Sequence, residues 1–275
     1  MNAKIKVYTG TALVLSLLLA ILKALCCLFC FDSTLGYFDN AFLVSLTNAI
    51  AWVSALWCAS ALFLIPKDSI TTPPQRSVPL VGGLLAAVLV TAAGVGLFVT
   101  NFVEKDKLSL VCGALLFASA SFFWFSLTAL SSRALVCLGM LAAFGYLSIL
   151  IVSHFDMFTA INSPLKMALH LSVIAAITML LTEIRLLFGD KASRVSFVTK
   201  MLTLLSCFPT AVGHLALYAS GKTPPLSEQT TTPFFLLALL GASVYAAIRL
   251  FAATDADDLA ESEEETDEEK EIEEI

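Results

Sequence analysis

The stretch that decides the fold runs from His170 to Arg194 and reads "HLSVIAAITMLLTEIRLLFGDKASR". Its first half is almost wholly apolar, and its second half closes with five charged residues: Glu183, Arg185, Asp190, Lys191 and Arg194. An apolar run followed by basic residues is typical of a membrane-spanning helix whose cytoplasmic end is anchored by Lys and Arg. The stretch therefore predicts a membrane helix and a cytoplasmic loop.

The composition of the whole chain indicates the same class. Hydrophobic residues make up 58% of the 275 residues and charged residues only 14%. Soluble domains contain roughly 45–50% apolar and about 25% charged residues. The surface of a water-soluble protein of this size would not accommodate so many Leu, Ala and Phe side chains, so we predict a polytopic membrane protein.

Eight apolar segments are long enough to cross a bilayer, which takes about 20 residues per helix. The runs are too long for strands of a membrane barrel and lack their alternating pattern. We therefore expect an all-α bundle of four helical hairpins over residues 1–253. The expected spans are Val7–Phe31, Ala41–Ile65, Leu80–Phe102, Leu108–Leu130, Ala134–Val152, Met167–Phe188, Phe197–Ala219 and Phe234–Ala253.

The distribution of Lys and Arg predicts the orientation of these spans. Basic residues gather in cytoplasmic loops of membrane proteins. With the N-terminus inside, the cytoplasmic side holds Lys4, Lys6, Lys67, Arg76, Arg133, Arg185, Lys191, Arg194, Lys200 and Arg249. The outer side then holds only Lys105, Lys107, Lys166 and Lys222, with Lys23 near the outer end of its helix. Both termini are therefore expected in the cytoplasm.

The C-terminal segment, residues 254–275, differs from the rest of the chain. It holds 13 of the 22 acidic residues. Like charges at this density repel one another and cannot build a core, so we expect a solvated, mostly disordered cytoplasmic tail. One interpretation is that the tail only solubilises the protein; the other is that it contacts the basic cytoplasmic rim or a protein partner.

Residues 132–190 and 193–254 show signs of an internal hairpin repeat. "SRALVCLGML" from Ser132 and "SRVSFVTKML" from Ser193 share Ser-Arg and Met-Leu at the same spacing. His154 and His214 each precede a proline by 10 residues, and "IRLL" and "IRLF" close the two hairpins. Direct repeats occur in membrane transporters, although apolar sequences also match by chance.

Glu183 is the acidic residue that the orientation rule does not explain. Arg185, two residues on, points to another face of the same helix, whereas Lys200 and Arg249 are expected at similar depth on neighbouring helices. An acid at this position tends to form a pair or to face the bundle interior. We predict an interhelical ion-pair cluster of Glu183, Arg185, Lys200 and Arg249. A proton or cation site and a headgroup-binding cluster are the functional alternatives.

A second group of polar residues falls in the outer half of otherwise apolar spans: Asn48, His170 and His214. Pro209 lies shortly before His214, where a bend would open space. We therefore predict a small ligand-binding pocket open to the outside, lined by His170 and His214. The alternative is that each side chain separately bonds a backbone carbonyl.

Motifs for catalysis and cofactors are not found. The histidines lack metal-ligand spacing, so no metal or cofactor is expected, and the Cys27–Cys30 CxxC has no outer partner cysteines for a redox relay. Nucleic-acid binding is not indicated either. The best hypothesis is an integral membrane protein that binds or transports a small solute or lipid; a non-catalytic sensor or subunit is the alternative, and an enzyme is disfavoured. We expect a multi-pass cell-membrane location.

Overall fold

The computed structural model describes residues 3–32, 36–39, 42–65, 80–104, 106–126, 132–155, 163–188, 194–221 and 232–273. Within these ranges the chain forms eight α-helices and one pair of very short strands. The helices are α1 (Ala3–Phe29), α2 (Phe42–Leu64), α3 (Leu80–Glu104), α4 (Lys107–Phe125), α5 (Ser132–Phe155), α6 (Pro164–Leu187), α7 (Arg194–Ala219) and α8 (Thr232–Glu273).

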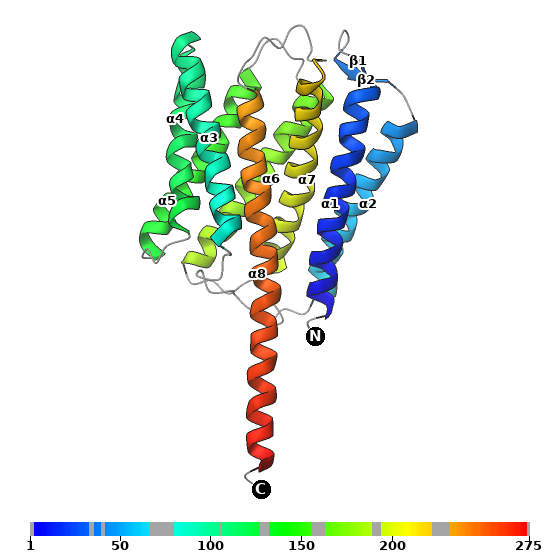
Figure 1. Ribbon diagram of the computed structural model, residues 1–275, viewed down its shortest axis with the longest axis vertical. Coiled ribbons are helices and arrows are strands. Elements are labelled where there is room, and N and C mark those ends of the chain that lie inside the picture. The colour runs from blue at the N-terminus through cyan, green and yellow to red at the C-terminus, as the bar shows by residue number, and fades with distance from the viewer. Residues whose placement is uncertain are drawn as a thin grey trace.

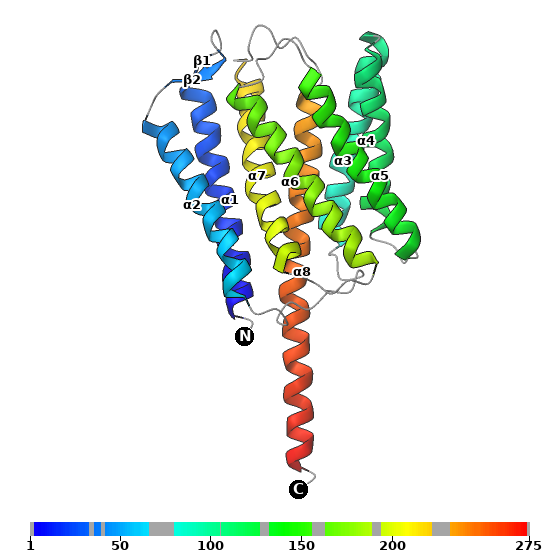
Figure 2. The ribbon, with the colours of Figure 1, turned by 180° about the vertical axis from the view of Figure 1, so that it is seen from behind.

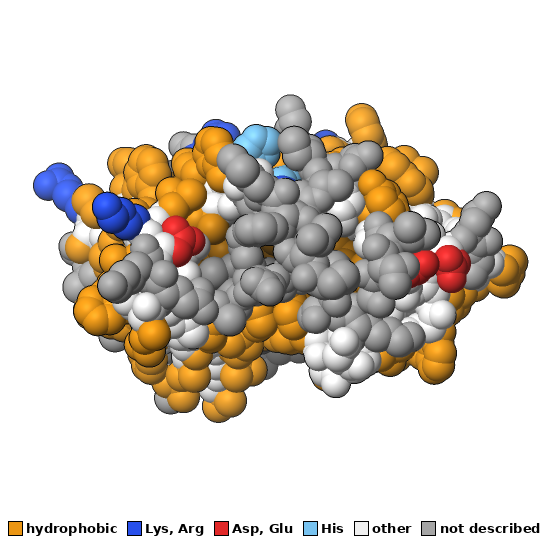
Figure 3. Space-filling view, turned by 90° about the horizontal axis from the view of Figure 1, so that it is seen from above, with side chains coloured by type: hydrophobic (Ala, Val, Ile, Leu, Met, Phe, Trp, Pro, Cys, Tyr) orange, Lys and Arg blue, Asp and Glu red, His pale blue; other side chains and the backbone are white. Residues whose placement is uncertain are grey.

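All eight helices are long and apolar enough to cross a membrane. This confirms the expectation of an all-helical chain with eight helices that are able to span a membrane. Large apolar side chains remain exposed on the outside of the bundle, for example Phe63 at 84% and Phe42 at 81%. Seen from above, hydrophobic side chains occupy much of the periphery (Figure 3). A surface of this kind suits lipid rather than water.

The helix ends depart from the expected ones by a few residues. The span expected at Leu108–Leu130 ends at Phe125 in α4, and residues 127–131 lie outside the described part of the chain. Asp106 caps α4, because its carboxylate accepts a hydrogen bond from the backbone N–H of Leu108 at 3.1 Å. Such a cap satisfies one of the free N–H groups at a helix start.

A small antiparallel hairpin follows α1, and the sequence patterns did not predict it. Strand β1 (Phe31–Asp32) pairs with β2 (Tyr37–Phe38). Gly36 has a φ of 72°, a conformation that glycine adopts without steric cost. The chain therefore turns back on itself, and the hairpin sits at the end of α1 (Figure 1).

Helices α3 to α8 pack as a closed ring in chain order, because each packs against the next and α8 packs against α3. The α1–α2 hairpin lies outside this ring and packs mainly through α1 against α7 (Figures 1 and 2). Consecutive helices pair within all four expected hairpins. The α1–α2 hairpin and the ring thus meet along α7.

Glycines and aromatic side chains set the packing of the ring. A Cβ atom on Gly113 of α4 would lie 2.6 Å from the backbone N of Phe98 in α3, so these two backbones are in direct contact. The centre holds Phe122, Phe123 and Tyr245, which meet edge to face. Side chains therefore fill the ring, and its axis is a packed core.

The acidic segment differs from expectation, because α8 continues as one helix to Glu273. Glu, Ala, Leu and Lys are strong helix formers, and extending an existing helix avoids the unfavourable nucleation step. The disorder expected for this segment is not confirmed and stays a prediction. In Figures 1 and 2 this part of α8 projects beyond the bundle, and the two chain ends leave the bundle at the same end.

The proposed hairpin repeat stays a prediction, as do the cytoplasmic location of the termini and the division at residue 254. The residues that the repeat would equate have different surroundings. His154 is exposed and His214 is buried, and Arg185 is exposed whereas Arg249 is buried.

Candidate functional site

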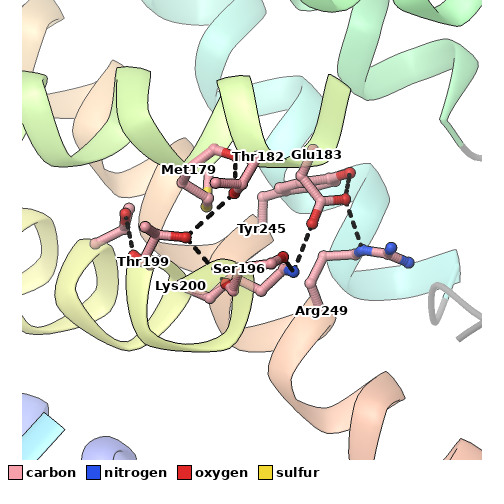
Figure 4. A network of polar contacts seen from close by, with 9 residues as sticks. Met179, Thr182, Glu183, Ser196, Thr199, Lys200, Tyr245 and Arg249 are labelled. Carbon is pink, nitrogen blue, oxygen red and sulfur yellow. Dashed lines mark hydrogen bonds and ion pairs between the residues drawn. The ribbon is translucent and has the colours of Figure 1, made fainter. Parts of the chain in front are cut away.

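Glu183 lies where α6, α7 and α8 meet. Its Oε1 forms an ion pair with the Nζ of Lys200 on α7 at 2.7 Å. Its Oε2 accepts a hydrogen bond from the Nε of Arg249 on α8 at 3.0 Å. Figure 4 shows the two bases approaching the carboxylate from different helices. The structure thus brings together three of the four residues expected in this cluster.

Neighbouring polar side chains extend the cluster. Tyr245 donates a hydrogen bond to Oε2 of Glu183 at 3.5 Å, and the Nζ of Lys200 donates to the Oγ of Ser196 at 2.6 Å. The side chains of Glu183 and Arg249 are each only 5% exposed. Charges removed from water to this degree are stable only with partners, so these contacts fix the relative positions of three helices.

The charge of this cluster is not balanced, because two cations face one carboxylate. Among the described residues, the Nη1 of Arg249 is buried without a hydrogen-bond partner. The fourth expected member, Arg185, lies at an exposed position of α6. Its inclusion in the predicted cluster is not supported, because a residue two positions from Glu183 lies on another face of the helix.

A cleft lies at the junction of α1, α2, α6 and α7. It consists of two adjoining cavities of about 320 and 390 Å³. Both cavities share Lys23, Thr47, Asn48, Ala168 and Leu171. The first continues along Leu19, Ala51, Trp52, Ala55, Ser172, Leu202, Leu205, Ser206, Pro209 and Thr210. The second reaches toward the β-hairpin along Cys26, Tyr37, Phe38, Val44, Pro164 and Met167.

The cleft is open toward the outer surface of the helix bundle. Two of its lining residues expose most of their side chains: Trp52 at 72% and Leu171 at 62%. In a protein that spans a membrane, such exposed apolar walls face lipid. A ligand would therefore reach this cleft most directly from the lipid phase.

Lys23 gives the cleft its charge. Its Nζ lies 4.8 Å from the centre of the Phe38 ring, an arrangement in which the aromatic face attracts the ammonium group. None of the described residues that line the two cavities is Asp or Glu. The cleft therefore has one basic side chain, placed where the two cavities adjoin, and mostly apolar walls.

The contact between α1 and α7 positions Lys23. A Cβ atom on Gly213 would lie 2.6 Å from the Cγ of Lys23, so the aliphatic stem of the lysine packs directly on the α7 backbone. The stem is thereby confined while the ammonium group stays at the cleft. Glycine at this position allows the close approach.

The floor of the cleft contains a polar contact between α6 and α7. Ser172 Oγ lies 3.0 Å from both the carbonyl oxygen of Ser206 and the Oγ1 of Thr210. Pro209 lies beside these groups and lines the cavity. A proline within a helix removes one backbone hydrogen bond and often marks a bend. The cavity thus adjoins the proline, although the expected pocket lined by His170 and His214 is not found among the described cavities.

The three outer polar residues are not brought to one place. Asn48 lines the cleft, but neither His170 nor His214 is among the residues that line these two cavities. His170 Nε2 instead contacts the Oγ of Ser153 on α5 at 3.0 Å. His214 is buried in α7, and its Nε2 has no hydrogen-bond partner among the described residues. In place of the histidines, the described cleft has Lys23.

The count of basic residues places Lys23 with the outer-side charges and does not predict its position in the cleft. The signal was present, since "AILKALCC" places one lysine inside an apolar run. A charge at such a position is by default a functional-site hypothesis. The sequence did not reveal that α1 docks on α7, which is what brings Lys23 to the cleft.

Other candidate chemistry is limited. No group of three or more His, Cys, Asp or Glu side chains suited to a metal ion occurs in the described ranges. Cys27 and Cys30 are buried free thiols. Burial in apolar surroundings disfavours the thiolate, the form in which a cysteine reacts.

The eight apolar helices fit a multi-pass membrane protein, and the described helices form a cleft between them. Comparisons with known proteins add no activity: no family model, no curated protein and no solved structure matches the chain.

Proposed function

We propose that the protein binds or transports a small solute or lipid, and that the cleft between α1, α2, α6 and α7 is its binding site. One observation carries this proposal: the cleft combines a few polar side chains with apolar walls that open to the outside of the bundle. Ligand sites in proteins are mostly apolar hollows with a few placed polar groups.

The size and place of the cleft support the proposal. Cavities of about 320 and 390 Å³ fall at the lower end of the roughly 300–1,000 Å³ that ligand sites occupy. Sites between the helices of a bundle are common. The Glu183 cluster lies elsewhere, between α6, α7 and α8, and serves in this proposal to hold the helices that form the cleft floor.

The direct test is purification in native lipid, followed by mass spectrometry of retained small molecules. Ala168 lines both cavities, so Ala168→Phe should fill the cleft. The exposed position Val99 on α3 gives a matched control, Val99→Phe, which adds the same ring outside the cleft. A ligand present in the wild type and the control but lost from Ala168→Phe supports the proposal. Equal retention by all three proteins contradicts it.

A second candidate function, a non-catalytic sensor or subunit acting through a protein partner, is favoured by one observation. Helix α8 extends over 42 residues and carries the acidic segment beyond the bundle. A projecting acidic helix suits a basic protein surface. Deleting residues 255–275 should then leave the fold intact while abolishing a specific protein contact. Unchanged partners after this deletion would remove the support for the alternative.

A further inference from the structure

The charge of the cleft narrows the chemistry of its ligand. We propose that the cleft binds a single-chain amphiphile with a singly charged anionic head, such as the carboxylate of a fatty acid, and that Lys23 is the counter-ion of that head. This inference rests on the proposed function, because it assigns a ligand class to the same cleft.

The first argument is charge complementarity. The Lys23 ammonium contacts the ring of Phe38, and neither of the ion pairs found among the described residues involves it. A cation at low dielectric gains most from an opposite charge, and no described cleft residue is acidic. An anionic head beside Lys23 would supply the missing charge, and the amide of Asn48 would be available as a further donor.

The second argument is the arrangement of apolar surface. From Lys23 the cleft continues along Leu19, Trp52 and Leu205. These side chains form an apolar wall that leads away from Lys23, opposite a floor that carries Ser172, Ser206 and Thr210. Because the wall is exposed at Trp52, the far end of an acyl chain could leave the cleft and join the surrounding lipid.

The third argument is size. Cavities of about 320 and 390 Å³ are small for ligand sites, which reach roughly 1,000 Å³. One chain with a compact head suits this volume better than a phospholipid with two chains. A single positive charge also matches one carboxylate.

The experiment measures binding of defined probes to the full-length protein in zwitterionic nanodiscs by native mass spectrometry. The probes are oleate, oleyl alcohol, dioleoylphosphatidylglycerol and inorganic phosphate. We expect one equivalent of oleate to be retained. Oleyl alcohol has the same chain without the charge and should bind roughly 10- to 100-fold more weakly, the effect of losing a hydrogen bond to a charged group.

Variants test the role of the lysine itself. Lys23→Gln should weaken oleate binding by a similar factor, and Lys23→Arg should retain it. Lys107, exposed at the start of α4 and at the same end of the bundle, gives the matched control Lys107→Gln, which should bind oleate as the wild type does. If Lys23→Gln does not fold, the comparison of oleate with oleyl alcohol in the wild type still decides the point.

Each contrary result overturns a stated part of the inference. Equal binding of oleyl alcohol, or unchanged oleate binding in a folded Lys23→Gln protein, overturns the role of charge. Tighter binding of dioleoylphosphatidylglycerol than of oleate overturns the claim that the ligand has a single acyl chain. Equally tight binding of inorganic phosphate overturns the claim that the ligand needs an acyl chain. Retention of a neutral lipid that is lost only in Ala168→Phe refutes this inference but leaves the proposed function standing. Binding of no probe, with no retained ligand in native lipid, refutes both.

Discussion

Replacing Glu183 with Gln should destabilise the protein strongly. The substitution preserves side-chain shape but removes the one carboxylate among the described side chains that pairs with Lys200, at 2.7 Å, and with Arg249, at 3.0 Å. The side chains of the two bases are only 9% and 5% exposed, so both would become buried charges without a counter-charge. Removing one partner of a buried pair costs about 3–5 kcal/mol.

This cost can be measured as a change in apparent melting temperature in detergent at a fixed scan rate. In proteins of 150–250 residues, 1 kcal/mol shifts the melting temperature by roughly 2–4 °C, so Glu183→Gln should lower it by about 6–20 °C. Arg185→Gln is the control, because this residue is an exposed charge on the same helix and should change stability by about 1 kcal/mol or less.

A double variant checks the cause of the loss. Adding Lys200→Met to Glu183→Gln removes one of the two uncompensated cations, so part of the lost stability should return. The reasoning is refuted if Glu183→Gln has the melting temperature of the wild type. It is also refuted if the double variant loses as much stability as the two single variants lose in sum.

Two further predictions concern topology and packing. Reporter fusions should read outside after Asp39, Asp106, Asn162 and Thr223, and inside after Thr71, Ser132, Lys191 and Thr254; opposite signals at two or more sites would reject this orientation. Gly113→Ala should lower the melting temperature by forcing α3 and α4 apart, at a cost of about 1–3 kcal/mol. The matched change Gly10→Ala meets no atom within 4 Å and should be neutral or slightly stabilising, so similar losses in both would contradict the close approach.

The spans and the partners of Glu183 could be predicted because they depend on local features. The length of an apolar segment determines whether it can cross a bilayer. Glu183, Lys200 and Arg249 each lie near an end of their apolar segment, so they are expected at a similar depth. A buried acid at that depth requires a base. The pairing geometry then follows once α6, α7 and α8 are neighbours, as their chain order suggests.

The cleft could not be predicted in the same way, because it depends on how one hairpin docks. Nearly every position of α1 is apolar, so no face of the helix indicates that α7 is its main neighbour. The position of Lys23 against Gly213 joins residues far apart in the sequence. The prediction that both histidines line one pocket depends only on their similar depth in the helices. Depth does not determine which way a side chain faces around the helix axis, and His170 on α6 faces Ser153 on α5.

The most direct measurement of the central claim is the position at which a bound lipid reacts with the protein. A fatty acid with a photoactivatable diazirine on its chain, incubated with the protein in nanodiscs and irradiated, should label residues of the cleft. Peptide mass spectrometry should locate the label near Trp52, Leu171 and Leu205, and excess oleate should suppress it. Labelling spread over the exposed faces of α3, α4 and α5, unaffected by oleate, would contradict a binding site in the cleft.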